Sequence, residues 1–316
     1  MKQPEFDKAG YSIWDMEIYN HALTYPLDKF HPTDIPRYID EYVDRFPKWI
    51  MSTKLNTVKG LDTFPNQVVT HGTSQAMDWW HYWCEWNNLT CKVFRGEYPY
   101  HKDLRQGACP FIEEHPLQKG DALLISLPFS GNGGSHERML EAFDTCDKLG
   151  IPVFIDACWF GCCSGLNFDF QRECIQAVAF STTKSLKTDA WRNGMIFSKH
   201  RVGGIQKLYE WRWLSSFNLA IGLHQMEKFS PDYMHNKYSQ IYDEVCDDLK
   251  LKTTNTIFIA LGEGDKYKDE QYERYWRDDT YCRINVRNHL KHFYKLRNNK
   301  DKYDLAASFQ KTIDEI

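Results

Sequence analysis

Residues 181–194 read STTKSLKTDAWRNG and begin at the end of an apolar run, Ala177–Ser181, which predicts a buried strand. Lys184 therefore lies in a loop just after a strand, with hydroxyl side chains before it and Arg192 eight residues further on. A partly desolvated amine near cations can act as a nucleophile, and a guanidinium can grip a phosphate through two parallel hydrogen bonds. The segment thus predicts a Schiff-base site for a phosphorylated aldehyde; the plain alternative is a polar loop with an exposed lysine.

Strand and helix patterns alternate around this segment. Helices are predicted over Ser74–Asn88 and Ser135–Leu149, the second with one apolar face. Six short runs predict strands: Gln67–His71, Cys91–Arg95, Ala122–Leu127, Pro152–Asp156, Ala177–Ser181 and Met195–Ser198. Strands that alternate with covering helices predict an α/β fold with a mostly parallel sheet between helices.

The sequence patterns at the two ends of the chain differ from the alternating strands and helices of its centre. The elements expected there are helices over Asp34–Ile50 and from Trp213 to Leu251, strands at Thr256–Leu261 and Tyr281–Val286, and a solvated loop at Gly262–Asp279. We therefore expect residues 62–214 to form a large domain. Residues 1–61 and 215–316 are expected to build a smaller α+β domain together.

Composition excludes several classes of protein. The 316 residues include 39 basic and 43 acidic ones, a net charge of −4, so the chain lacks the basic excess of dedicated nucleic-acid binders. Hydrophobic residues at 42% and aromatic residues at 15% indicate a folded chain. No apolar run approaches the roughly 20 residues that span a bilayer, and no signal-peptide pattern opens the chain. We expect a cytoplasmic protein without membrane or nucleic-acid partners.

Ten cysteines in such a protein are expected to be reduced and mostly buried. The densest group, Cys158, Cys162 and Cys163, lacks the repeated C-x-x-C spacing of a zinc site. We interpret it as packing, and we expect no metal site.

The pattern Ser-x-x-Lys, seven residues, Arg-x-Gly resembles the cofactor-lysine motif of the aspartate-aminotransferase-like family of pyridoxal-phosphate (PLP) enzymes, fold type I. The resemblance implies PLP as cofactor and a large domain with a seven-stranded type of sheet. It also implies that Lys184 forms a Schiff base with PLP, while Ser181 and Arg192 hold the phosphate. Lys187 is the competing lysine, but it lies five residues before Arg192 rather than eight, so the spacing favours Lys184.

Two further motifs follow the order that this family shows. Gly72, Thr73 and Ser74 form a glycine turn and helix start after a strand, where backbone amides can bind an anion; the turn resembles the family's phosphate-binding turn. It also resembles an ordinary helix cap. Asp156 ends an apolar strand, and a buried carboxylate needs a cationic partner. The resemblance places it opposite the PLP pyridinium nitrogen; a capping role is the alternative.

Two loops resemble segments that contact the cofactor ring. Asn132, in a loop where Gly133 and Gly134 replace the usual Pro-Thr, matches the asparagine that hydrogen-bonds the phenolic oxygen of PLP. Tyr98 matches the aromatic residue that stacks on the pyridine ring, with Tyr100 as the second choice. A plain glycine-rich loop and a plain core aromatic are the alternatives.

One position departs from the family, and one site residue lies near the end of the chain. Trp159 occupies the position of a tyrosine that donates to the phenolic oxygen in most relatives, and an indole N–H can donate but not accept. Arg283, on a predicted strand, resembles the arginine that binds the substrate carboxylate, with Arg287 as its rival. For His71 and His101 we predict hydrogen-bonding roles.

These resemblances imply an aminotransferase that moves an amino group between an amino acid and a 2-oxo acid. Lys184, Asp156 and Tyr98 would be the catalytic residues, and the protein would be a homodimer. The same constellation serves a lyase or decarboxylase. A PLP-fold protein without catalysis, acting as a binding or regulatory module, is the third hypothesis.

Overall fold

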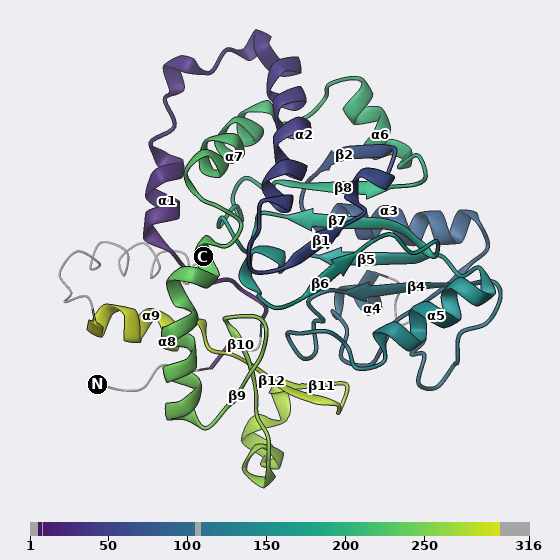
Figure 1. Cartoon of the computed structure of the whole chain (residues 1–316), viewed down its shortest axis with the longest axis vertical. Helices are drawn as coiled ribbons and strands as arrows, with labels where there is room; N and C mark the ends of the chain where they lie inside the picture. The colour runs from purple at the N-terminus through teal and green to yellow at the C-terminus, as the bar shows by residue number, and fades with distance from the viewer. Residues whose placement is uncertain (1–5, 8, 105–108, 298–316) are drawn as a thin grey trace.

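A six-stranded sheet forms the centre of the computed structural model, which describes residues 6–7, 9–104 and 109–297 (Figure 1). The strands lie in the order β2-β8-β7-β5-β4-β3. Their bounds are β2 Asn66–Thr70, β3 Thr90–Lys92, β4 Asp121–Ser126, β5 Val153–Ala157, β7 Ile175–Ser181 and β8 Gly194–Ser198. β8 runs antiparallel to its neighbours β2 and β7, and the other neighbouring pairs are parallel. The predicted α/β fold with a mostly parallel sheet is confirmed.

The six strands predicted in the centre of the chain all belong to this sheet, but their ends and the number of strands in the sheet differ from expectation. The run Cys91–Arg95 yields only the short strand β3. A sheet of seven strands was expected, and the described residues supply six. The stretch between β3 and β4 adds a single parallel bridge, Val93 to Phe111, because the chain turns away into the short helix α4 (Tyr100–Leu104).

Helices cover both faces of the sheet. The longer ones are α1 Met16–Leu23, α2 Ile35–Met51, α3 Thr73–Trp86, α5 Met139–Leu149, α6 Gly203–Glu210, α7 Ser216–Lys228, α8 Tyr233–Leu249 and α9 Arg287–Arg297. Because side chains of a strand alternate between faces, Phe154 on β5 contacts Trp80 of α3, with ring centroids 5.5 Å apart. Val153 and Ile155 point to the opposite face of the sheet. There they belong to a hydrophobic cluster with buried residues of α2, α5 and α7. Burial on both faces explains the continuous apolar runs of the strands.

A second sheet is built from the C-terminal part of the chain. Its antiparallel strands lie in the order β11-β12-β10-β9, with bounds β9 Lys252–Thr253, β10 Ile259–Leu261, β11 Trp276–Arg277 and β12 Tyr281–Asn285. The N-terminal segment joins it through a bridge between Asp7 and Asn285. Gly262–Asp279 is not a plain loop, because it contains two 3₁₀ helices (Asp265–Lys268 and Glu270–Tyr275) and β11.

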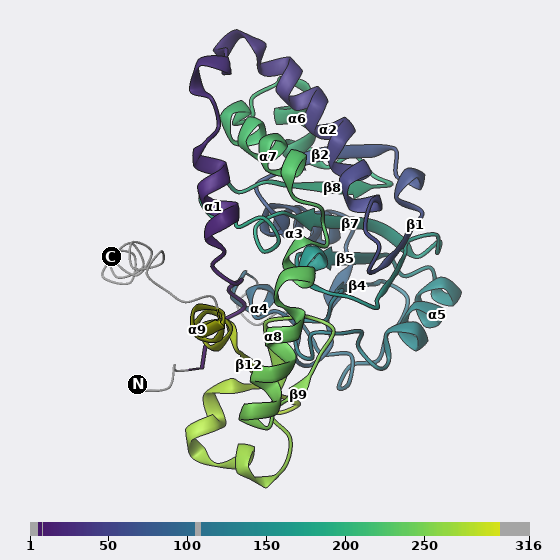
Figure 2. The same ribbon diagram turned by 60° about the vertical axis from the view of Figure 1, so that its left-hand side comes forward.

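Figures 1 and 2 show the four-stranded sheet at one end of the molecule and α2 with α7 at the other. α2 contacts α7 and β2. A separate two-stranded parallel pair, β1 (Thr57–Lys59) with β6 (Asn167–Asp169), flanks the centre. The division into residues 62–214 and the two chain ends stays a prediction.

All ten cysteines lie in the described part of the chain, and none forms a disulfide. Cys162 and Cys163 are buried, and burial holds the pKa of the Cys162 thiol above its ordinary value. Cys158 is partly exposed. None of the described helices combines the length and the apolar character that crossing a membrane requires.

The first residue of β8, Gly194, provides a test of how closely the strands approach. It pairs with Thr70 on β2 and Ser181 on β7, and a Cβ there would lie 2.6 Å from the Phe180 carbonyl oxygen and 2.9 Å from Gly72 Cα. Backbone cannot move aside cheaply, so we expect Gly194→Ala to lower the free energy of unfolding by about 1–3 kcal/mol in urea denaturation.

Gly204→Ala is the matched control. Gly204 lies in α6, and a Cβ there meets no atom within 4 Å. Because alanine favours helix over glycine, its stability should be unchanged or slightly higher. An equal loss in both variants would contradict the close approach at Gly194.

Candidate functional site

A cavity of about 450 Å³ lies at the carboxyl edge of the six-stranded sheet. Ser126, Asp156 and Ser181, at or near the ends of β4, β5 and β7, form part of its wall. The structure brings most of the predicted site residues to this wall: Thr73, Ser74, Tyr98, Asp156, Trp159, Ser181, Lys184, Arg192 and Arg283. Gly72 lies directly behind Arg192, and Asn132 is not part of the wall.

Gly72, Ser181 and Arg192 converge at the start of α3. Gly72 has a φ of +75°, and a Cβ there would lie 3.0 Å from Arg192 Nη2 and 3.5 Å from Ser181 Oγ. Arg192 Nη2 also donates to the His71 carbonyl oxygen at 3.2 Å. Glycine is thus required both by the turn and by the guanidinium packed against it. A cation, a hydroxyl and a helix N-terminus at one point form a cradle for an anion such as a phosphate.

The loop after β7 is held by hydroxyl groups. Ser181 Oγ donates to the Asn193 carbonyl oxygen at 3.0 Å and accepts from the Thr183 backbone N–H at 3.1 Å. The Thr183 hydroxyl lies 2.7 Å from the same Oγ. These bonds tie the two ends of the loop together and fix the backbone on which Lys184 sits.

Lys184 and Lys187 take different directions. Lys184 lines the cavity, and its Nζ lies 5.7 Å from the ring centroid of Tyr11. Lys187 is outside the wall, forms an ion pair with Asp189 and lies over the Trp14 ring. The geometry therefore agrees with the choice of Lys184 that its spacing to Arg192 favoured.

Asp156 is 4% exposed, and its own side-chain carboxylate lies near the carboxyl end of β5. Its Oδ1 accepts the Cys158 N–H at 3.0 Å. Burial and then the Glu97 carboxylate raise the pKa of Asp156 to about 7, against the opposing effects of Thr73, Cys158 and Lys184. A cationic group placed opposite this carboxylate would offset the free-energy cost of ionising it in a buried place.

Glu97 was not foreseen in the sequence. It is buried and accepts from Ser126 N–H at 2.7 Å, from the Ser126 hydroxyl and from Tyr98 N–H at 2.7 Å. Burial raises its pKa above the ordinary value. Its bonds connect β4 to the segment that carries Tyr98, a long-range link with no local sequence signal.

Both aromatic candidates line the cavity. The rings of Tyr98 and Tyr100 stack with centroids 5.8 Å apart and an interplanar angle of 14°. Tyr98 is 41% exposed, so its ring is available for contact with a ligand. Of the two predicted histidines, His71 supplies the carbonyl that Arg192 contacts, and buried His101 has its ring nitrogen 3.3 Å from that of His81.

Arg283 is 2% exposed and reaches the cavity from β12. Its Nη1 donates to the Ser130 carbonyl oxygen at 2.9 Å, and its guanidinium lies 5.6 Å from the Trp159 ring centroid. Burial, followed by the charge of Arg277, lowers the pKa of Arg283 to about 9. The rival Arg287 is not in the wall and pairs with Asp7 at 3.0 Å.

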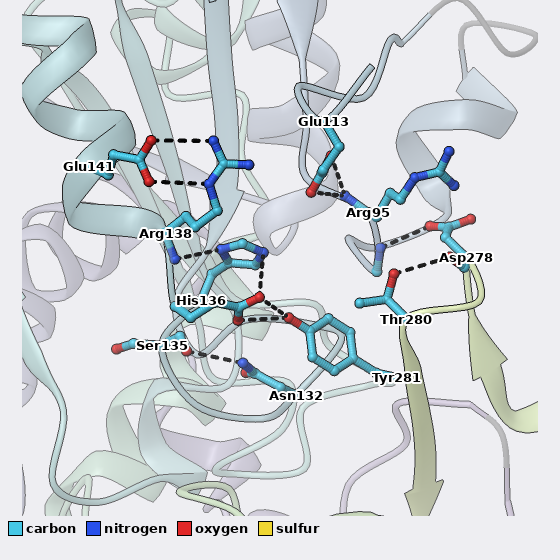
Figure 3. Close-up of polar contacts among 12 residues, drawn as sticks. Arg95, Glu113, Asn132, Ser135, His136, Arg138, Glu141, Asp278, Thr280 and Tyr281 are labelled. Carbon is cyan, nitrogen blue, oxygen red and sulfur yellow. Dashed lines mark hydrogen bonds and ion pairs between the residues drawn. The ribbon is translucent and has the colours of Figure 1, made fainter. Parts of the chain in front are cut away.

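The position of Asn132 does not support its predicted contact with the cofactor. Its side chain serves its own loop, since Oδ1 accepts Gly134 N–H at 2.8 Å and Nδ2 donates to the Ser135 carbonyl oxygen at 3.0 Å (Figure 3). Ser130, two residues earlier, lines the cavity instead. The sequence revealed the loop but not which of its residues faces inward.

The wall contains further residues without a sequence signal. Ala9, Gly10 and Tyr11 enter from the N-terminal segment, and Arg274 and Arg277 enter from the segment that was expected to be a solvated loop. Among the described residues, no group of three or more His, Cys, Asp or Glu side chains is placed to hold a metal ion.

No protein-family model and no curated protein sequence matches the chain. Solved structures do match it. A PLP-bound C-S lyase from Staphylococcus hominis has a TM-score of 0.62 at 11% identity, over 88% of this chain and 87% of that chain. A Methanococcus jannaschii protein, described as similar in its active site to kynurenine aminotransferases, has 0.60 at 15%, over 91% and 88%.

Aspartate aminotransferase from Thermotoga maritima has a TM-score of 0.58 at 17% identity, over 92% of this chain and 91% of that chain. At these identities the likeness concerns the fold. The chain therefore has the aspartate-aminotransferase-like fold, fold type I, of PLP-dependent enzymes.

Proposed function

We propose that the protein is a PLP-dependent aminotransferase that moves an amino group between an amino acid and a 2-oxo acid. One observation carries the proposal: a lysine, a buried carboxylate and an anion cradle surround a single cavity at the strand ends. These are the three groups that an aldehyde, a protonated ring nitrogen and a phosphate require.

The residues fit the cofactor. Gly72, Ser181 and Arg192, with the start of α3, would hold the phosphate. Asp156 would pair with the ring nitrogen, and its raised pKa supports this role because a cationic partner stabilises its charged form. When bound, PLP delocalises the negative charge that develops on the substrate Cα.

The chain's own residues bind the substrate and move its proton. Lys184 Nζ would hold the cofactor covalently. As a free amine it would take the proton from the substrate Cα and deliver it to the aldehyde carbon of the cofactor. Arg283 would grip the α-carboxylate and so orient the Cα–H bond, while Tyr98 would pack against the cofactor ring. Trp159, under the Arg283 guanidinium, limits where the carboxylate can lie.

A lyase acting on an amino acid is the second candidate. The observation that favours it is the shared fold with a C-S lyase, whose TM-score of 0.62 exceeds those of the other two structures named above. The two reactions use the same cavity residues and differ in the bond that breaks. We further propose a homodimer; the cytoplasmic location stays a prediction.

The cofactor lysine is tested by Lys184→Ala. We expect the variant to lose the visible absorption band of lysine-bound PLP and to lower the amino-transfer rate by about 100- to 10,000-fold, because the proton carrier is gone. Lys187→Ala is the matched control and should keep the band. A wild-type protein that stays colourless after addition of PLP would refute the cofactor.

The reaction is tested by incubating the PLP-loaded protein with a panel of amino acids and one 2-oxo acid. Transamination predicts a new 2-oxo acid and a new amino acid in equal amounts, because the amino group is conserved. Release of ammonia or carbon dioxide in proportion to substrate consumed would identify the lyase or decarboxylase instead. No turnover with a normal absorption band would support the non-catalytic hypothesis.

Asp156 gives a pH prediction for the cofactor-free protein. Its pKa rises from 3.8 to about 7 on folding, so its favourable contribution is complete below pH 4 and is lost as the pH rises to 7. The shift corresponds to at most about 4 kcal/mol. In urea denaturation, Asp156→Asn should gain stability relative to wild type over this range, while it weakens PLP binding.

Glu141→Gln, on the surface beside Arg138, is the control and should leave this part of the pH dependence in place. A parallel pH profile for wild type and Asp156→Asn would show that the carboxylate is not penalised by burial.

A further inference from the structure

A buried chain of hydrogen bonds connects Arg283 to Glu97, a carboxylate that lies behind the cavity wall. Arg283 Nη1 donates to the Ser130 carbonyl oxygen at 2.9 Å and to the Ser130 hydroxyl oxygen at 3.3 Å. The Ser130 N–H donates to Ser126 Oγ at 2.9 Å, and the Ser126 hydroxyl donates to Glu97 Oε1. All four residues are buried, and three of them line the cavity, whereas Glu97 does not. Glu97 therefore acts on a ligand through its neighbours.

The direction of these hydrogen bonds is fixed at both ends of the chain. A guanidinium has only donors, and an ionised carboxylate has only acceptors. The Ser126 hydroxyl has a single hydrogen, and because its oxygen accepts from Ser130, that hydrogen is directed to Glu97. The bonds from Arg283 to Glu97 thus run from donor to acceptor, with a cation at one end and an anion at the other. Hydrogen bonds aligned in this way polarise and strengthen one another in a buried place.

The contacts of Glu97 favour its ionised form. Its two oxygens accept from the Ser126 N–H at 2.7 Å, from the Ser126 hydroxyl and from the Tyr98 N–H at 2.7 Å. Burial raises the pKa of Glu97, and the bonds from Ser126 and Tyr98 and the charge of Arg283 oppose that rise. Hydrogen bonds to an ionised acceptor are stronger than bonds between neutral groups. The anionic end of the chain is thus held firmly in one place.

The chain follows the strand ends that carry the site. Ser126 pairs with Asp156 across β4 and β5, and Ser130 follows the end of β4 by four residues. Arg283 belongs to β12 of the second sheet. The large sheet therefore orients the guanidinium through these bonds before a ligand arrives, which reduces the entropy cost of binding.

We propose that Glu97 is a positioning residue for the substrate carboxylate: through Ser126 and Ser130 it fixes the direction in which the Arg283 guanidinium faces the cavity. The inference rests on the proposed function, because it adds a second residue to the carboxylate contact assigned to Arg283. It makes the strength of that contact depend on a buried acid that touches neither the substrate nor the cofactor.

Matched ligand pairs isolate the carboxylate contact. An amino acid is compared with the amine that lacks its α-carboxylate: L-phenylalanine with 2-phenylethylamine, and L-alanine with ethylamine. Both members of a pair react through the amine, but only the amino acid has a carboxylate for Arg283. We would measure each dissociation constant from the change that the ligand causes in the visible band of the PLP-loaded protein. The ratio of the two constants, the carboxylate preference, reports this contact.

Glu97→Gln keeps the size of the side chain but brings an amide donor toward the donors of Ser126 and Tyr98. We expect the carboxylate preference to fall by about 10-fold, as for a lost charge-assisted hydrogen bond, and amine binding to change by less than about threefold. Ser126→Ala removes the hydroxyl link and should lower the preference by about 3- to 10-fold. Because both changes break one chain, the double variant should be no worse than Glu97→Gln.

Asp121→Asn is the matched control. Asp121 is a buried acid at the other end of β4, where it pairs with Lys92 at 2.7 Å, and it is not part of the cavity wall. Like Glu97→Gln, this change should lower the free energy of unfolding in urea, because it breaks a buried ion pair. The carboxylate preference should stay unchanged, which separates a loss of stability from a loss of positioning.

The outcomes separate this inference from the proposed function. An equal loss for both ligands of a pair in Glu97→Gln, losses that add in the double variant, or a wild type without carboxylate preference overturns the inference, while the PLP band leaves the cofactor intact. If Glu97→Gln does not fold, Ser126→Ala decides, and an unchanged preference overturns the inference.

If PLP does not bind, the proposed function fails, and the hydrogen-bonded chain is tested by itself. The probe is 3-phenylpropionate, a carboxylate without an amine, and its binding to the cofactor-free protein is measured by calorimetry. Binding that is about 10-fold weaker in Glu97→Gln than in wild type supports the role of Glu97 at Arg283. Equal binding by both proteins, or no binding by wild type, overturns it.

Discussion

The buried carboxylate of Asp156 is the constraint on which this site depends. It is the penultimate residue of β5, an interior strand of the large sheet, where it is 4% exposed and has Glu97 as a neighbour. Burial, followed by the nearby Glu97 carboxylate, raises the cost of ionising Asp156, and its pKa of about 7 expresses that cost. The surrounding structure supplies hydrogen bonds to both groups, but it leaves the charge of Asp156 to be met by a cation. Under the proposed function, a positively charged ligand atom in the cavity above this acid would supply that cation.

Close packing of backbone segments forms the second part of the site, an anion cradle next to Asp156. β8 runs against the direction of its neighbours, and its first residue, Gly194, lies between the ends of β2 and β7. Without a side chain there, the Gly72 turn approaches the loop after β7 closely enough for Arg192 and Ser181 to lie beside it. The residues of the proposed phosphate cradle thus come from two strand ends that are more than 100 positions apart in the chain, and two glycines bring them together.

The sequence predicted those parts of the fold and site that are local. Lys184, Ser181 and Arg192 belong to one stretch of 14 residues, and Asp156 ends a recognisable strand, so type and position could both be inferred. Arg283 was predicted on its strand, but other residues placed by distant pairings escaped detection. Tyr11 enters because Asp7 bridges to Asn285, and Glu97 matters because it receives bonds from Ser126. Arg277 was assigned to a solvated loop, since the charges around it give no sign that the segment folds back into a strand. Asn132 lies outside the cavity wall, because a glycine-rich loop offers several polar residues and only the folded turn decides which of them faces the cavity.

Contacts between the two sheets set the geometry of the charged groups in the cavity. Lys184 stands on the loop after β7, whereas Arg283 stands on a different sheet, so no secondary-structure element fixes their separation. What joins the two sheets at this point is the Tyr281 ring against Gly96 and Gly131, with the Gly96 N–H bonded to Asp278. Orientation of the bond to be broken depends on where the carboxylate is held relative to the amine, and displacements near 1 Å change rates strongly. Under the proposed function, two glycines and a tyrosine outside the cavity wall would therefore act on the reaction by fixing the distance between Arg283 and Lys184.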